Sequence, residues 1–344
     1  MQSALRKVLV TGAAGFVGSA VAARLAAMGH SVVGCDNFND YYDPRLKTGR
    51  VQSLLAPAGI ACHSVELADG AQVQALFERE QPALVVHLAA QAGVRYSIDN
   101  PAAYVQSNLV AFGHMLEACR HHKVQHLLYA SSSSVYGANA SLPFSEDDKT
   151  DAPVSMYAAT KKANELMAHS YSHLFALPAT GLRFFTVYGP WGRPDMAYFS
   201  FAEKMMRGEP IPVFAEGKLS RDFTYIDDIV EGVVRLLHKP QPAAGANGED
   251  RVPHTVFNIG NHQPVRVLEF IQTLERVLGV NANMNFLPMQ PGDVPATYAA
   301  IDRLRDWVGF APTTTLETGL SRFRDWYLPW RAERDTLAPA AKNN

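Results

Sequence analysis

The sequence is poor in cysteine and contains neither a block of one charge nor a long apolar run. Its three cysteines, Cys35, Cys62 and Cys119, lie far apart and form no CxxC pair. We therefore expect no disulfide framework and no metal site, and such cysteine usage is typical of a reducing cytoplasm. The formal net charge of −2, without a basic stripe, predicts no nucleic-acid partner. No segment is apolar over the length of a membrane span, so we expect no membrane partner. The expected strand KVLVTG follows the N-terminus too closely for a signal-peptide core, so we expect no signal peptide.

Apolar residues nevertheless make up 47% of the 344 residues, enough for a substantial core. In the first half, short apolar runs alternate with helical patterns over 15–28, 70–80, 101–122 and 156–175. The expected strands are KVLV (7–10), SVVGCD (31–36), ACHSVEL (61–67), ALVVHLA (83–89), HLLYASS (126–132) and ATGLRFF (179–185). Such alternation predicts an α/β fold with a doubly wound parallel sheet.

Beyond residue 185 the pattern is less regular and predicts a smaller, irregular α/β part. Its expected elements are a Gly/Pro-rich loop GPWGRPDM (189–196), a short strand PIPVF (210–214), helices over 226–238 and 266–279, a strand VFNIG (256–260) and a surface loop over 240–254. We expect the tail RAERDTLAPAAKNN (331–344) to be frayed.

A glycine-rich turn lies between the first strand and the first helix. Gly12, Gly15 and Gly18 follow the spacing GxxGxxG within VLVTGAAGFVGSAVAARL. Glycine allows the backbone to turn tightly and to approach a pyrophosphate, which the helix N-terminus then attracts. Although such spacing also arises by chance, its place between strand and helix predicts a dinucleotide site.

The second strand ends in Asp36, at the distance expected for the acid that accepts the adenosine ribose hydroxyls. A carboxylate there repels a 2′-phosphate and no arginine follows it, so NAD is favoured over NADP. Asp36 could also be a simple turn residue. Glu66 and Leu67, at the end of the third strand, are expected near the adenine.

Tyr157 and Lys161 occur as YAATK in a predicted helix, where positions i and i+4 share one face. A free phenol has a pKa of about 10 and is a poor base at neutral pH. A nearby ammonium and the positive nicotinamide ring should draw that pKa down and favour the phenolate. Such a pair is common in helices, but downstream of a dinucleotide loop it predicts catalysis.

Together these features resemble the extended short-chain dehydrogenase/reductase family, over nearly the whole chain. The similarity to its nucleotide-sugar epimerase branch rests on HLAAQAGVRYS (87–97), SNLVAF (107–112), SSSSVYG (131–137), YAATK (157–161), RFFTVYGPWGRPDM (183–196), RDFTYIDD (221–228) and QPGDV (290–294). The resemblance implies a Rossmann domain that binds NAD over 1–182 and a nucleotide-sugar domain mainly over 183–344, with parts near 222–260 returning to the first. It places NAD against Gly12, Gly15, Phe16, Val17, Gly18, Asp36, Asn37, Glu66, Leu67, Leu88, Ala89, Ala90, Gln91, Tyr157 and Lys161.

The resemblance also assigns Ser132, three positions before the Val of VYG, to the sugar O4 and to proton relay with Tyr157. Sugar 4,6-dehydratases carry Asp-Glu in the next two positions, and UDP-glucuronate decarboxylases typically carry Glu just before that Val. Here those positions are Ser133 and Ser134, which cannot act as carboxylic acids. What remains is oxidation and reduction at C4, which implies 4-epimerisation.

GVRYS together with GPWGRPDM is most similar to UDP-glucuronate 4-epimerases, which would convert UDP-glucuronate to UDP-galacturonate. Thr186 stands where UDP-glucose 4-epimerases usually have Asn. Our hypothesis is that Ser133, Thr186 and Arg193 hold the sugar carboxylate by charge-assisted hydrogen bonds and thereby deter loss of CO₂. Arg193 could instead bind phosphate or cap its loop.

The resemblance implies that Arg221 binds the UDP diphosphate, that Asp293 binds a uridine ribose hydroxyl, and that Arg95 faces the sugar or the phosphates. The family often has Arg where this chain has Gln290, which leaves one diphosphate contact in doubt. Asn108 is expected to support the backbone of the site, and His87 to be a structural histidine within a buried strand.

Other functions remain open at this point. The protein could epimerise UDP-glucose or UDP-N-acetylglucosamine, decarboxylate UDP-glucuronate, act as a net dehydrogenase, or sense dinucleotides without catalysis. The family also implies a homodimer in which the helices near 101–122 and 156–175 pair with their copies. Leu109, Phe112 and Leu116 could serve either that interface or the internal core.

Overall fold

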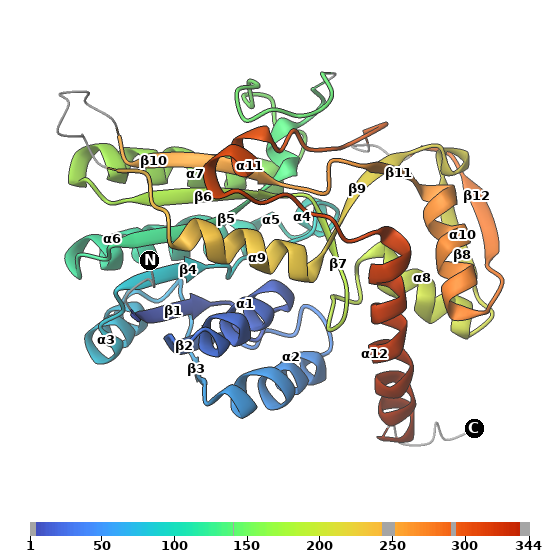
Figure 1. The fold of residues 1–344 in the computed structure, drawn as a ribbon, viewed down its shortest axis with the longest axis horizontal. Coiled ribbons are helices and arrows are strands. Elements are labelled where there is room, and N and C mark those ends of the chain that lie inside the picture. Colours follow the sequence, from blue (N-terminus) through green and yellow to red (C-terminus); the bar gives the residue numbers. More distant parts are fainter. Residues whose placement is uncertain (1–4, 140, 243–251, 290–293, 338–344) are drawn as a thin grey trace.

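The computed structural model describes residues 5–139, 141–242, 252–289 and 294–337. A parallel sheet with the strand order β10-β6-β5-β4-β1-β2-β3 forms its centre, and a smaller α/β part lies to one side (Figure 1). The strands are β1 (Lys7–Thr11), β2 (Ser31–Asp36), β3 (Ala61–Ser64), β4 (Leu84–His87), β5 (His126–Ser132), β6 (Ala179–Phe184) and β10 (His254–Ile259). The predicted doubly wound α/β fold is confirmed, although the third strand ends three residues earlier than expected, at Ser64.

Helices cover both faces of this sheet. They are α1 (Phe16–Ala27), α2 (Pro44–Arg50), α3 (Gly70–Glu80), α4 (Tyr96–Asp99), α5 (Pro101–Tyr104), α6 (Ala111–His121), α7 (Met156–Phe175) and α9 (Ile226–Leu237). A π-helical turn at Val105–Val110 joins α5 to α6, and another at Val51–Leu55 extends α2. Of the described helices, none combines the length and apolar character needed to cross a membrane.

Strand β1 shows why the strands of this sheet are apolar on consecutive residues. Val8 and Val10 pack in one cluster with Leu25 of α1, whereas Leu9 packs in another with Phe77 of α3. Successive side chains of a strand point to opposite faces, and both faces of a parallel sheet are covered. Phe112 and Leu116 are fully buried in the second cluster, so they serve the internal core.

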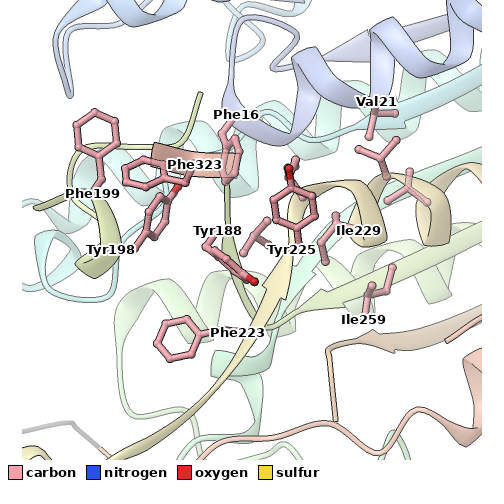
Figure 2. Packing of buried hydrophobic residues seen from close by; sticks show 14 of the residues in the cluster. Phe16, Val21, Tyr188, Tyr198, Phe199, Phe223, Tyr225, Ile229, Ile259 and Phe323 are labelled. Carbon is pink, nitrogen blue, oxygen red and sulfur yellow. The ribbon is translucent and has the colours of Figure 1, made fainter. Parts of the chain in front are cut away.

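Among the described residues, the smaller part contains a three-stranded and a two-stranded sheet with helices packed against them. Its elements are β7 (Thr186–Tyr188), β9 (Ser220–Tyr225) and β11 (Pro264–Arg266), β8 (Pro210–Phe214) with β12 (Asn283–Leu287), and α8 (Ala197–Met206), α10 (Val267–Leu278) and α12 (Leu316–Leu337). Helix α11 (Asp302–Val308) instead packs against β10 and α9 of the larger part. Figure 2 shows Phe16 of α1, Tyr188 of β7, Tyr225 of β9 and Phe323 of α12 within one hydrophobic cluster. The two parts therefore share a core.

The prediction of a frayed tail is wrong for residues 331–337, which form the last turns of α12. Arg334 there pairs with Glu203 of α8 at 2.7 Å, and its guanidinium lies 4.9 Å from the ring centre of Trp330. These tertiary contacts stabilise a helix end that composition alone predicts to be loose. Residues 338–344, and residues 243–251 of the predicted surface loop, lie outside the described residues.

Two buried histidines should make the stability of the fold depend on pH. Burial lowers the pKa of His87 to about 3 and that of His126 to about 4. The unfolded chain protonates both below its ordinary histidine pKa of about 6.5, whereas the folded chain does not. The free energy of unfolding should therefore fall as the pH drops below that value, by about 1.4 kcal/mol per pH unit for each histidine. Urea unfolding at pH 8, 7, 6 and 5 measures this, and equal stability at pH 7 and 5 would contradict it.

Candidate active site

A cavity opens where the carboxyl ends of β1, β2, β4 and β5 meet. The strand order reverses at β1, because the chain continues to β2 on one side and later returns to β4 on the other. Open α/β sheets bind ligands at such a switch point. All the residues predicted to contact NAD line this cavity: Gly12, Gly15, Phe16, Val17, Gly18, Asp36, Asn37, Glu66, Leu67, Leu88, Ala89, Ala90, Gln91, Tyr157 and Lys161. Four predicted substrate residues also line it: Ser132, Ser133, Thr186 and Arg193.

The turn between β1 and α1, which we call the glycine loop (residues 11–18), needs glycine for two reasons. Gly12 has a φ of +66°, in the left-handed region, and a Cβ there would lie 2.8 Å from the backbone nitrogen of Ala89. A Cβ on Gly18 would lie 2.0 Å from the carbonyl oxygen of Gly12. Helix α1 begins after Gly15 without a side-chain cap, so its first amides face no competing side-chain oxygen. This backbone fits the pyrophosphate of a dinucleotide.

Asp36 is buried at the end of β2, where its Oδ1 accepts a hydrogen bond of 2.9 Å from the Phe38 amide. The ammonium of Lys47 lies 3.3 Å from the same oxygen and donates to Asn39 at 3.0 Å. Lys47 and Asn39 also line the cavity, and sequence reasoning missed both. No local pattern marks Lys47, because it reaches Asp36 only through the packing of α2 near the end of β2. The acid expected to repel a 2′-phosphate therefore has a cation beside it.

Asn108 supports the cavity from behind, as the sequence predicts. Its Oδ1 accepts from the Gln91 amide at 2.8 Å, and its Nδ2 donates to the Gln91 carbonyl at 3.0 Å. The same Nδ2 lies 3.0 Å from the hydroxyl of Thr160 on α7. Asn108 thus ties the segment after β4 to the helix that carries Tyr157. His87 is likewise structural, since it is buried against the Thr11 hydroxyl at 2.9 Å.

Tyr157 and Lys161 lie in the first turns of α7, whose N-cap Ser155 accepts a hydrogen bond from the Ala158 amide. Both side chains face the cavity. Ser132, at the end of β5, hydrogen-bonds to the Tyr157 phenol. The Lys161 ammonium donates to the Ala130 carbonyl at 2.9 Å, and burial lowers its pKa to about 8. The structure therefore brings all three predicted catalytic residues together.

The surroundings of the Tyr157 phenol act on its pKa in opposite directions. Burial raises the pKa of Tyr157 above its ordinary value, and the hydrogen bond from Ser132 and the charge of Arg193 oppose that rise. The ammonium of Lys161 donates to the Ala130 carbonyl, and its effect on the phenol stays a prediction. The groups that favour the phenolate here are a serine hydroxyl and an arginine.

The serines that follow β5 face different partners. Ser131 donates to Glu165 at 2.7 Å, and Arg183 donates to both oxygens of the same buried carboxylate at 2.8 Å. Ser132 turns the other way and lies 3.1 Å from the Ser134 hydroxyl at the edge of the cavity. Side chains alternate along a strand, so one serine anchors the strand to α7 while the next faces the cavity.

This anchor predicts a large stability effect. Although burial alone would raise the pKa of Glu165, the hydrogen bonds and charge of Arg183 hold it below its ordinary value. Glu165→Gln should lower the free energy of unfolding by about 3 kcal/mol, because it leaves the buried Arg183 charge without its partner. Glu231→Gln, which breaks the more exposed pair with Arg235, should cost less than about 1 kcal/mol. Urea unfolding of both variants measures the difference, and equal costs would contradict the anchor.

Arg193 enters the cavity from the loop over residues 189–196, which we call the arginine loop. Its Nε and Nη2 donate to Asp195 at 3.1 and 3.0 Å, and Asp195 also accepts from Tyr41 at 3.3 Å. The Nε and Nη2 edge of the guanidinium is therefore occupied by the Asp195 carboxylate, in the two-pronged geometry that suits such a group. Tyr41 and Tyr42 line the cavity as well, and sequence reasoning did not assign them.

The other predicted substrate residues are not among those lining the cavity. Arg95 is exposed, with its guanidinium 5.3 Å from the ring centre of Phe214. Arg221 donates to the carbonyls of Ser220 and Val294 at 2.9 Å. Asp293 lies outside the described residues. Their roles toward UDP stay predictions.

The acids of the cavity are confined to one end. Of its described lining residues, Asp36 and Glu66 carry carboxylates, and both follow the ends of β2 and β3. Glu66 accepts from Asn37 at 2.9 Å, which keeps it beside Asp36. Around Tyr157 the lining offers hydroxyls and the guanidinium of Arg193 instead. This end of the cavity offers a phenol for proton transfer and a guanidinium for an anion, and none of its described lining residues is a carboxylic acid.

The model of the NAD dependent epimerase/dehydratase family matches residues 8–260 of this chain. The chain belongs to that family. A probable UDP-glucuronate 4-epimerase from Rhizobium meliloti (strain 1021) is 48% identical to this chain. The match covers 93% of this chain and 96% of the relative. A crystal structure of UDP-glucuronic acid 4-epimerase from Bacillus cereus, in complex with UDP-glucuronic acid and NAD, has a TM-score of 0.83 and 35% identity, covering 93% of this chain and 98% of that one.

A UDP-glucose 4-epimerase from Thermotoga maritima, solved with UDP-glucose, has a similar TM-score of 0.82 at 26% identity, covering 95% of this chain and 99% of that one. Because enzymes named for different sugars match this fold almost equally well, the fold does not select the sugar. Within the family, the side chains around Tyr157 must do so.

Proposed function

We infer that the protein epimerises UDP-glucuronate at C4 to UDP-galacturonate, with NAD as a cofactor that is regenerated in each cycle. The observation that carries this inference is the lining around Tyr157, which combines neutral hydroxyls with Arg193 and lacks a carboxylate among its described residues. Dehydration would need an acid there. An anionic sugar, by contrast, matches Arg193 and the serines. The relatives named for UDP-glucuronate support the same choice.

The residues at the other end of the cavity fit NAD. The glycine loop can approach the pyrophosphate, and Asp36 lies where the adenosine ribose hydroxyls need an acceptor. When bound there, NAD supplies reversible hydride acceptance. The chain holds it in place and determines which carbon of the sugar faces it.

We assign the proton chemistry to Tyr157 and Ser132. Tyr157 takes the proton from O4 as C4 is oxidised, and Ser132 relays it because its hydroxyl both donates and accepts. Lys161, held by the Ala130 carbonyl, supports the coenzyme side of the site. The 4-keto sugar then rotates to present its opposite face for reduction. Tyr157 returns the proton to O4, and C4 now has the opposite configuration.

Ser133, Thr186 and Arg193 are assigned to the C5 carboxylate. A β-keto acid loses CO₂ most readily when the breaking bond stands perpendicular to the carbonyl plane. A carboxylate held by an arginine and two hydroxyls can be kept from that orientation. The same three residues then provide both substrate choice and protection of the 4-keto sugar.

Sugar specificity is tested by comparing UDP-glucuronate, UDP-glucose and UDP-N-acetylglucosamine as substrates of the purified protein. We expect kcat/KM to be at least about 10-fold higher for UDP-glucuronate, since a charge-assisted hydrogen bond contributes about 1.5–3 kcal/mol. A preference for either neutral sugar would contradict the assignment and favour the alternative epimerases.

We further propose that residues 1–182 hold NAD and that 183–344 mainly hold the nucleotide sugar, with parts near 222–260 returning to the first domain. The pairing of β10 with β6 supports this proposal. A homodimer formed through α6 and α7 is supported by Leu166 and Leu174 of α7, which are 58% and 67% exposed.

The three cysteines are free thiols, which supports a reducing cytoplasm.

A further inference from the structure

Arg50, the last residue of α2, is fully buried between the glycine loop and the arginine loop. Its Nη1 donates to the Ala14 carbonyl at 2.9 Å and to the Tyr42 hydroxyl at 2.6 Å. Its Nε donates to the Trp191 carbonyl at 2.9 Å, and its Nη2 to the Gly192 carbonyl at 3.1 Å. One side chain thus binds the backbone of both loops.

The charge of Arg50 has no carboxylate at ion-pairing distance among the described residues. Burying a guanidinium without a counter-charge is costly, and a hydrophobic side chain would normally pack as well. The flat guanidinium, however, can reach three carbonyls in fixed directions, which neither a lysine nor an apolar side chain can do. Because burying this charge is costly, we infer that the link between the glycine loop and the arginine loop has a function.

Packing contacts also restrict the backbone of the arginine loop, in addition to the hydrogen bonds from Arg50. Trp191 has a φ of +61°, in the left-handed region, and its ring lies 5.1 Å from that of Trp326 on α12. A Cβ on Gly49 would lie 3.0 Å from the Trp191 ring, and a Cβ on Gly192 would lie 1.5 Å from the Tyr198 hydroxyl. Packing against Gly49, Tyr198 and Trp326 thus limits the positions open to this backbone, and Arg50 links its carbonyls to the glycine loop.

We propose that Arg50 is a positioning residue, which sets the orientation of Arg193 and couples it to the occupation of the glycine loop. This proposal rests on the proposed function in one respect, namely that Arg193 holds the sugar carboxylate. A dinucleotide that orders Ala14 also orders the Trp191 and Gly192 carbonyls through Arg50. Binding of the sugar carboxylate then costs less, and the coupling acts equally in both directions.

Arg50→Lys tests the proposal, since lysine keeps the charge but has no planar fork to span the three carbonyls. Affinities for UDP-glucuronate and UDP-glucose are measured by calorimetry with NAD bound, in a Tyr157→Phe background that prevents turnover. We expect Arg50→Lys to reduce the preference for UDP-glucuronate by about 10-fold, the effect of one lost charge-assisted hydrogen bond. The affinity for UDP-glucose should change by less than about 3-fold, because that sugar does not use Arg193.

Arg235→Lys is the matched control. Arg235 also donates to two main-chain carbonyls, of Val308 and Gly309, but on α9 and away from the cavity lining. This variant should keep the preference of the parent. An Arg50→Lys variant that binds both sugars more weakly by the same factor, or that keeps the preference, would overturn the proposal and leave Arg50 a purely structural residue.

Hydrogen exchange provides a readout that does not depend on the sugar. Added NADH should protect peptides covering 12–18 and 189–196 in the parent protein. In Arg50→Lys we expect protection of 12–18 to persist and that of 189–196 to be lost. If the parent shows no preference for UDP-glucuronate, the assigned substrate is wrong, and the exchange result alone then decides the proposal. Protection of 189–196 that survives the substitution would refute the coupling.

Discussion

Replacing Tyr157 by phenylalanine is expected to lower kcat for UDP-glucuronate by about 10³-fold, the usual contribution of a group that takes a proton in the rate-determining step. The phenol lies beside Ser132 in the cavity, and the nearby lining has no carboxylate among its described residues to replace it. Binding should survive, because removal of one hydroxyl leaves the glycine loop and Arg193 unchanged. The measurement combines kcat for epimer formation with the dissociation constant of UDP-glucuronate by calorimetry.

Tyr171→Phe is the matched control for this prediction. Tyr171 lies on the same helix and donates to Glu117 at 2.6 Å, remote from the residues that line the cavity. It should retain kcat within about 2-fold, as expected of a partly exposed hydroxyl far from the chemistry. A Tyr157→Phe variant with near-parent kcat would revive the reading of the protein as a dinucleotide sensor.

Arg193→Ala is expected to change both substrate binding and product. Loss of the guanidinium should raise KM for UDP-glucuronate by about 10- to 100-fold, since its charge-assisted bonds to a carboxylate contribute about 1.5–3 kcal/mol. In the 4-keto sugar the carboxylate is then free to turn. The C5–carboxylate bond breaks, CO₂ leaves, and its electron pair forms an enolate that takes a proton from solvent. A fraction of turnovers should therefore yield a UDP-4-keto-pentose, which chromatography separates from the epimers.

Arg207→Ala controls for the loss of an arginine–carboxylate pair outside the cavity. Arg207 pairs with Glu203 at 2.6 Å on the surface of α8. It should alter neither KM nor the product mixture. Unchanged UDP-glucuronate kinetics in Arg193→Ala would remove Arg193 from the site and leave it a residue that caps its loop on Asp195.

The sequence predicted the parts of the site that depend on local patterns. The glycine loop, Asp36 and the pair Tyr157 and Lys161 each follow from spacing along one strand or helix, and all of them line one cavity. Parallel strands bring such residues together because their carboxyl ends meet at one edge of the sheet. For this reason local patterns were enough to predict which residues meet at the end of the cavity that we propose for the coenzyme.

Residues that reach the site through long-range contacts were not predictable in this way. Lys47 meets Asp36 because α2 folds back over the end of β2. Arg50 donates to main-chain carbonyls, one of them 142 positions away, and carbonyls have no sequence signature. The helical tail likewise depends on Arg334 and its partner Glu203 on another helix. These features are properties of the packed chain.

The serines at 131–134 were predictable in part from the local pattern and in part only from the packed structure. The pleat of a strand predicts that Ser131 and Ser132 face opposite ways. Only the packed structure shows that one of them binds the buried Glu165 and the other the phenol. The contact to which we assign proton transfer was predicted, whereas the hydrogen bond between Ser131 and Glu165 was not.

The most direct test of transient oxidation at C4 is to incubate the purified protein with UDP-glucuronate that carries deuterium at C4, and to analyse the products by mass spectrometry and NMR. We expect UDP-galacturonate that keeps its deuterium at C4, because the hydride removed from the sugar is the one returned to its other face. Loss of the label to solvent, or UDP-pentose as the main product, would contradict this account.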